Sequence, residues 1–144
     1  MPVTRRSRLL EAPPGSIWRV VSDPHQLPRW WPAVRRVEGV GSDRFTQVLL
    51  TAKDRPVRLD MRIAVTDPGS AVAWEQELAG TPFARHLAEA VTSVALAAEG
   101  AGTRVTLEQR QRLRGLSRGG GWMLRRATAR RLEEALHRLD ELLG

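Results

Sequence analysis

The longest periodic pattern in the chain lies near its C-terminal end, between residues 118 and 143. Apolar side chains recur there at steps of three and four residues, as they do along the buried face of an α-helix. The positions on this line are Trp122, Ala129, Leu132, Leu136, Leu139 and Leu143, and the line is widened by Leu124, Ala135 and Leu142. The pattern therefore predicts one long helix that packs its apolar face on a core.

Arg125 interrupts this apolar line, since it lies between Trp122 and Ala129 at the same spacing. A guanidinium at such a position must reach water, an acidic side chain or an anionic ligand, because burying it alone would cost several kcal/mol. We therefore expect Arg125 either to extend to solvent at the mouth of a cavity or to bind a ligand carboxylate or phosphate. Three further arginines lie on or beside the opposite face of the predicted helix: Arg126, Arg130 and Arg131.

Most of the chain before this helix alternates between apolar and polar residues, which is the period of a β-strand. The clearest strand is 57–66, in which one face carries Val57, Leu59, Met61, Ile63 and Val65. Further strands are predicted at 3–11, 34–40, 44–53, 71–78 and 85–98 and around 105–111. For strand 85–98 we take the inner face to be His86, Ala88, Ala90, Thr92, Val94 and Leu96. The opposite parity would bury Glu89, although a bulge could switch the parity midway.

Two short helices are predicted after the first strand. The first follows two consecutive prolines and covers residues 17–21, and the second runs from about Pro24 to Arg29. Asp23 is a good N-cap for the second helix, Pro24 suits its first position, and Gln26 occupies the capping-box position.

The order of these elements predicts a single α+β domain over residues 1–144. A run of antiparallel strands followed by one long helix implies a curved sheet of about seven strands wrapped around that helix. The inner face is lean in volume, because Ala88, Ala90 and Thr92 occupy positions that large side chains would fill in a solid core. We therefore expect an internal cavity between the sheet and the helix.

Several short motifs carry a resemblance to a known family. They are Ala12-Pro13-Pro14 before Ile17-Trp18, Ser22-Asp23-Pro24, Leu27-Pro28-Arg29-Trp30-Trp31-Pro32, Trp74-Glu75, Gly80-Thr81-Pro82-Phe83, and Gly102-Thr103-Arg104-Val105-Thr106-Leu107. With the order of elements, they resemble the helix-grip fold of the START and birch-pollen-allergen superfamily, also called SRPBCC. The resemblance is closest to the bacterial polyketide cyclase/dehydrase and lipid-transport group and covers essentially the whole chain. It implies a cavity for lipids, polyketides, isoprenoids or other apolar molecules, and catalysis in a minority of members.

The candidate ligand-binding residues follow from the predicted inner faces and aromatic positions. They are Trp31, Leu59, Met61, Trp74, Gln76, Phe83, His86, Trp122 and Arg125. For the aromatic residues of this set, core packing and cavity lining both remain open, whereas Trp18 and Trp30 are expected in the core. His86 is either a hydrogen-bonded interior histidine or an acid/base group.

Three functions are compatible with these residues. The first is non-covalent carriage of a small hydrophobic or amphipathic ligand. The second is a polyketide cyclase or dehydratase that uses His86 as its acid/base. The third is a basic module that associates with a membrane or a ribosome. The sequence has no His, Asp and Glu cluster at metal-ligand spacing and no phosphate-binding loop, so neither a metal nor a cofactor is expected.

Composition narrows these alternatives only slightly. The chain has 23 Lys and Arg against 16 Asp and Glu, a formal net charge of +7, 42% hydrophobic residues and no Cys. The arginines are scattered beside acidic residues and accompany no nucleic-acid motif, so nucleic acid is not an expected partner. An anionic membrane surface is a possible partner because the predicted helix begins with a basic segment. No signal peptide or membrane span is recognisable, which predicts a cytoplasmic protein. For the oligomeric state, a monomer and a homodimer both remain open.

Overall fold

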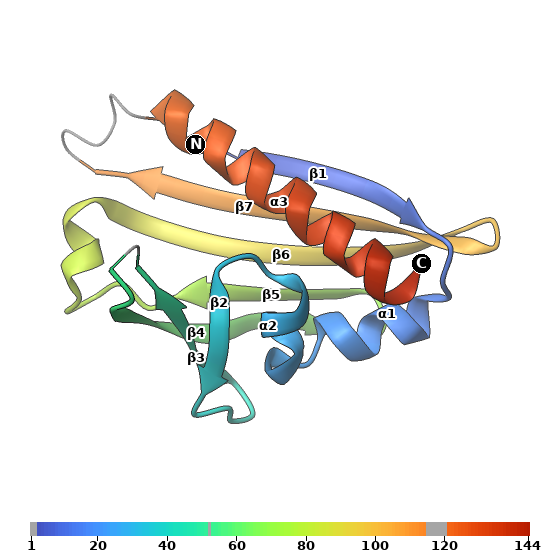
Figure 1. Cartoon of the computed structure of the whole chain (residues 1–144), viewed down its shortest axis with the longest axis horizontal. Helices are drawn as coiled ribbons and strands as arrows, with labels where there is room; N and C mark the ends of the chain where they lie inside the picture. Colours follow the sequence, from blue (N-terminus) through green and yellow to red (C-terminus); the bar gives the residue numbers. More distant parts are fainter. Residues whose placement is uncertain (1–2, 52, 115–120) are drawn as a thin grey trace.

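The computed structural model describes residues 3–51, 53–114 and 121–144, and of residues 121 and 122 it describes the backbone only. Within these residues, a seven-stranded antiparallel sheet curves around the long helix α3 (Gly121–Leu143), which lies across the concave face of the sheet (Figure 1). The predicted fold class, a curved sheet closed on one long C-terminal helix, is therefore confirmed.

The strands follow one another around the sheet with one exception. They are β1 (Val3–Leu10), β2 (Val34–Glu38), β3 (Arg44–Leu50), β4 (Pro56–Asp67), β5 (Ala71–Gln76), β6 (Leu87–Glu99) and β7 (Gly102–Leu113). Their order across the sheet is β1-β7-β6-β5-β4-β3-β2. Strands β2 to β7 are joined as consecutive neighbours, whereas β1 pairs with β7 at the far edge, with Val3 opposite Arg110 and Leu10 opposite Thr103.

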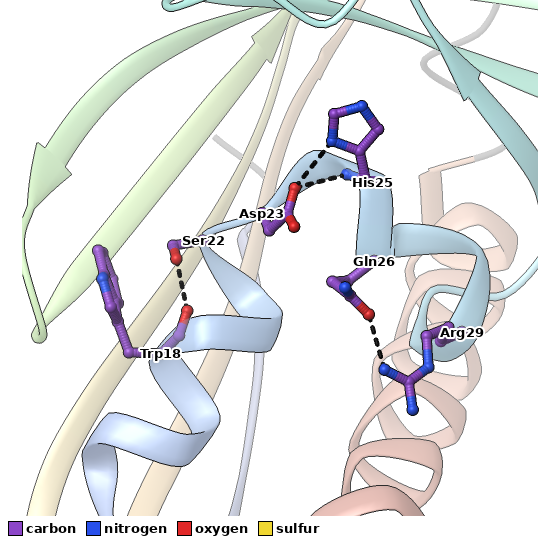
Figure 2. Close-up of polar contacts among 6 residues, drawn as sticks. All are labelled: Trp18, Ser22, Asp23, His25, Gln26 and Arg29. Carbon is purple, nitrogen blue, oxygen red and sulfur yellow. Dashed lines mark hydrogen bonds and ion pairs between the residues drawn. The ribbon is translucent and has the colours of Figure 1, made fainter.

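The connection from β1 to β2 contains the predicted short helices. These are α1 (Pro14–Val21), the 3-10 turn η1 (Pro24–Gln26) and α2 (Leu27–Trp30). The N-cap prediction is confirmed, because Asp23 Oδ1 accepts a hydrogen bond of 3.0 Å from the backbone N–H of His25 (Figure 2). Gln26 does not reach back to the cap residue as a capping box would. Its Oε1 instead accepts a hydrogen bond of 2.7 Å from Arg29 Nη1.

The main core lies under the C-terminal half of α3. Leu132, Leu136 and Leu139 of the helix are fully buried and belong to the same apolar cluster as Val94, Val105 and Leu107 of the sheet. Trp30 also belongs to this cluster and is 0% exposed, so its predicted core position is confirmed. Full burial of a leucine is worth roughly 1.5–3 kcal/mol, which makes this half of the helix the part that holds the sheet in its curved shape.

Two strand predictions were wrong in detail because of irregularities in pairing. The register between β4 and β5 shifts between Ile63 and Val65, and Val65 is consequently 52% exposed instead of buried. On β6 the predicted inner parity is confirmed for Thr92, Val94 and Leu96, which are all buried. A register shift between Leu87 and Glu89 ends this parity.

His86 lies before this irregularity and was placed incorrectly on the inner face. It caps the short 3-10 helix η2 (Pro82–Arg85), β6 begins only at the next residue, and the His86 side chain is exposed. The register shift between Leu87 and Glu89 separates it from the regular part of the strand, so the alternation of β6 does not extend back to His86.

The face of α3 that points inward also differs from the predicted line. Arg125 is exposed, whereas Thr128 is fully buried and Arg131, which we had placed near the opposite face, is partly buried. The drift of a seven-residue step around an α-helix is only about 20°, so Arg125 still lies near the line through Leu132. Arg125 is exposed because this part of the helix borders an open groove beside β1.

Candidate functional site: a cavity between the sheet and helix α3

A cavity of about 200 Å³ lies between the curved sheet and α3. Five consecutive strands and the segment before β2 line it, and one residue of α3 completes the wall. The lining residues are Trp31, Pro32, Ala33, Gln47, Leu49, Leu59, Met61, Trp74, Gln76, Ala90, Thr92, Gln109, Gln111 and Arg131. The cavity expected from the small inner-face residues is thus present, with Ala90 and Thr92 in its wall.

The structure brings five of the nine predicted ligand-binding residues to this cavity. These are Trp31, Leu59, Met61, Trp74 and Gln76. Phe83 and His86 belong to the segment around η2 and do not line it, and Arg125 lines a different groove. The Trp122 side chain lies outside the described residues. Sequence reasoning did not select Gln47 or Arg131, which both face the cavity.

The inner face of β6 and β7 changes character along its length. In the half that belongs to the core, Val94 pairs with Leu107 and Leu96 pairs with Val105. In the half that lines the cavity, Thr92 pairs with Gln109 and Ala90 pairs with Gln111. Because all these residues share one parity, the sheet continues unchanged while its inner surface turns from apolar to hydrogen-bonding. The cavity therefore begins where the leucine-rich core ends.

The hydrogen bonds in the cavity wall leave one acceptor unused. Gln109 Nε2 donates to Thr92 Oγ1 at 3.0 Å, and Thr128 Oγ1 of α3 donates to Gln111 Oε1 at 3.2 Å. Gln109 Oε1 is buried and has no hydrogen-bond partner. Gln47, on β3, is only 4% exposed. Buried amides without partners are costly, so this wall is suited to a molecule that brings polar groups.

Aromatic rings form the opposite part of the wall. The indoles of Trp31 and Trp74 meet edge to face with ring centroids 6.4 Å apart, and Trp74 meets Phe45 in the same way at 6.2 Å. Ala33 follows Trp31 and Pro32 with a φ of 73°, a left-handed conformation that is unusual for a residue with a side chain. This turn leads from α2 into β2 directly beside the cavity.

Arg131 is the charged residue among those described in the lining. Burial lowers the pKa of its guanidinium below the ordinary value, yet arginine keeps its proton in proteins. The lining contains no acidic residue within the described chain, and no ion pair of Arg131 is found there. The cavity thus combines aromatic rings, amides and one positive charge that lacks a protein counter-ion.

Arg125 lies in a separate open groove of about 380 Å³ between β1 and the start of α3. Arg5, Arg6 and Arg126 share this groove. Arg5 forms an ion pair of 2.7 Å with Glu108, and Arg6 lies 3.5 Å from Glu133. The groove is basic, but Arg125 is not positioned at the Trp31–Trp74 cavity where we expected it.

Two further findings concern the described part of the chain. No group of three or more His, Cys, Asp or Glu residues lies together in a way that could hold a metal ion there. None of the described helices is both long enough and apolar enough to cross a membrane.

The arrangement of sheet and helix recurs in solved structures. A START superfamily protein from Mycobacterium smegmatis matches with a TM-score of 0.77 at 11% identity, over 98% of this chain and 96% of that protein. The di-domain ARO/CYC proteins BexL, from the BE-7585A biosynthetic pathway, and StfQ, from the steffimycin pathway, match with TM-scores of 0.78 and 0.76. Their identities to this chain are 23% and 13%, and the matches cover 98% and 96% of it. The chain spans 46% of BexL and 49% of StfQ.

These matches define the class of the fold, which is the helix-grip fold of START and SRPBCC proteins. The family follows from the sequence itself. The model of the family described as polyketide cyclase / dehydrase and lipid transport matches residues 1–144, so the chain belongs to this family. No curated protein sequence matches the chain.

Proposed function

We propose that the protein binds a small amphipathic molecule non-covalently in the cavity between the sheet and α3 and acts as a carrier. The observation that carries this proposal is the composition of the wall, which combines the indoles of Trp31 and Trp74 with amides such as Gln76 and Gln109. Aromatic area binds an apolar body, and a few placed polar groups fix its orientation. The family, whose description includes lipid transport, supports the same reading.

The alternative reaction, a cyclase or dehydratase with His86 as acid/base, receives less support. His86 is exposed and does not line the cavity, and the described lining contains no His, Asp or Glu. A general acid or base must lie within hydrogen-bond reach of the proton that it moves. Turnover of a polyketide-like substrate that disappears in His86→Ala, with the fold intact, would restore the enzyme hypothesis.

Two alanines of β6 provide a matched test of binding. Ala90 lines the cavity, whereas Ala95 is exposed, so the two side chains lie on different faces of the sheet. Phenylalanine in place of Ala90 should fill the cavity, and Ala95→Phe should add the same ring to the outer surface. Both variants should keep the circular dichroism spectrum of the unmodified protein.

Native mass spectrometry of the three proteins, each purified from the original host, then measures binding. We expect a co-purifying small mass on the unmodified protein and on Ala95→Phe, and its loss from Ala90→Phe. A ligand mass retained equally by Ala90→Phe would place binding elsewhere on the molecule. A protein that carries no small mass and binds no amphipathic probe would contradict the carrier proposal.

A further inference from the structure

We infer that the ligand is a small aromatic carboxylate, whose anionic group binds Arg131 while its ring system lies against Trp31 and Trp74. This inference rests on the proposed function and narrows it to a class of compound. It also transfers the anion-binding role expected for Arg125 to a different residue of the same helix.

The charge of the cavity supports an anion. Arg131 is partly buried in the wall, and no acidic residue of the described lining can neutralise it. Its nearest acidic neighbours along α3, Glu133 and Glu134, are exposed and engage Arg6 and Arg138 instead. A desolvated guanidinium without a partner is unfavourable, and a bidentate carboxylate provides the best-matched planar acceptor for it.

The amides indicate that the ligand carries further polar atoms. Gln109 Oε1 is a buried acceptor with no partner and therefore favours a donor, such as a hydroxyl group on the ligand. The Gln47 side chain lies in the same wall and is nearly completely buried. A purely apolar chain would leave Gln109 Oε1 unsatisfied, at a cost of about 1–3 kcal/mol.

The size and shape of the cavity favour rings over a long chain. Its volume is about 200 Å³, whereas pockets for drug-sized molecules usually measure about 300–1,000 Å³. A cavity of about 150 Å³ is sufficient for benzene. One or two fused rings therefore fit, and the Trp31 and Trp74 indoles offer faces and edges for aromatic packing.

The test uses two probes of equal shape, 2-naphthoate and 2-naphthamide, which differ in charge. Affinities are measured by isothermal titration calorimetry for the unmodified protein, Arg131→Leu and Arg130→Leu. Arg130 is exposed and adjacent on the same helix, so its substitution is a matched control. We expect naphthoate to bind the unmodified protein about tenfold more tightly than naphthamide, as one charge-assisted hydrogen bond would provide.

In Arg131→Leu we expect the naphthoate affinity to fall by about tenfold or more, the naphthamide affinity to stay within about twofold, and Arg130→Leu to change neither. Arg131→Gln should show the same loss of naphthoate affinity. This variant controls for the possibility that the cavity repacks around a leucine at position 131. Thermal melts verify that each variant is folded.

Three results would overturn the inference. If Arg131→Leu weakens both probes equally, Arg131 acts through packing, and the carrier proposal survives. If Arg130→Leu has the same effect as Arg131→Leu, the basic surface as a whole attracts the acid. If neither probe binds the unmodified protein, this class of ligand is wrong, and the native mass measurement with Ala90→Phe still decides the carrier proposal separately.

Discussion

The indole of Trp31 meets that of Trp74 edge to face, at a centroid separation of 6.4 Å, across the wall of the cavity. Trp31 ends the short helical segment before β2, and Trp74 lies on β5, so the contact joins the two parts of the molecule that enclose the cavity. Both side chains are buried. The contact therefore contributes to stability as well as to the shape of the site.

We expect the contact between Trp31 and Trp74 to produce a coupling energy between substitutions at these two positions. Edge-to-face aromatic pairs are worth about 0.5–1.5 kcal/mol beyond the area that they bury. A double-mutant cycle with Trp31→Leu, Trp74→Leu and the double variant, measured by urea denaturation, should give a coupling of this size. Strictly additive losses would mean that the two rings contribute only through separate burial.

Leucines in the core and in the cavity wall should differ in their importance for stability. Leu136 is fully buried under α3, so Leu136→Ala should lower the free energy of unfolding by about 2–5 kcal/mol. Leu59 is only partly buried and lines the cavity. Leu59→Ala should cost clearly less in the same denaturation experiment. Equal costs would show that the cavity wall is packed as tightly as the core.

The hydrogen bond between Thr92 and Gln109 can be tested by removing first one partner and then both. Thr92→Val alone removes the acceptor of Gln109 Nε2 and should destabilise the protein by about 1–3 kcal/mol. Adding Gln109→Leu removes the orphaned amide and should recover most of this loss. Chemical denaturation of the two variants measures both effects. A double variant that is less stable than Thr92→Val would indicate that Gln109 has another stabilising contact.

Glu38 should make stability depend on pH in the acid range. Hydrogen bonds from Arg36 and Arg58 hold the pKa of the Glu38 carboxyl below its ordinary value of 4.5. Because the folded-state pKa is the lower one, the contribution is present above the unfolded-state pKa. It is lost as the pH falls through the folded-state pKa. The group is exposed, so the effect should be small and should shrink at high salt.

The measurement for Glu38 compares melting temperatures at about pH 6 and about pH 3. Glu38→Gln should lose less stability between these values than the unmodified protein does. An identical acid-dependent loss in Glu38→Gln would mean that the two arginines contribute nothing at this position. Repeating the comparison in about 0.5 M salt should reduce the difference between the proteins.

The fold was predictable because its signals are local and repeated. The alternation in 57–66, the proline-rich starts of the short helices and the leucine spacing after residue 131 all depend on sequence neighbours, and the structure confirms them. The alternation also placed Gln76 and Thr92 on the inner face, where they line the cavity. Parity along a regular strand is therefore a reliable guide to which residues face inward.

The wrong predictions concern side chains whose orientation depends on structure several residues away in the sequence. His86 was placed on the inner face by extending the parity of β6 backwards. This extension crosses a register shift that the local sequence does not indicate. Arg125 lies on nearly the same helix line as Leu132, but that part of α3 borders an open groove beside β1, which the helical period does not reveal. Arg131 was passed over because it lies about 100° around the helix from Leu132. A period of 3.6 residues drawn backwards from Leu132 passes close to both Thr128 and Arg125, so the helical period alone does not distinguish the buried Thr128 from the exposed Arg125. An arginine at the cavity was therefore expected, but the residue that lines it is Arg131 and not Arg125.

The pairing of Val3 with Arg110 has a consequence for the order in which the protein can fold during synthesis. The first strand leaves the ribosome early, but its hydrogen-bonding partner is made about a hundred residues later. Until then the backbone N–H and C=O groups of β1 lack the hydrogen-bond partners that β7 provides. The helix that completes the core is synthesised later still. Contacts so distant in sequence slow folding and leave unpaired edges exposed in the meantime. The nascent chain should therefore stay sensitive to proteases until α3 has emerged from the ribosome, and then become resistant in a single late step.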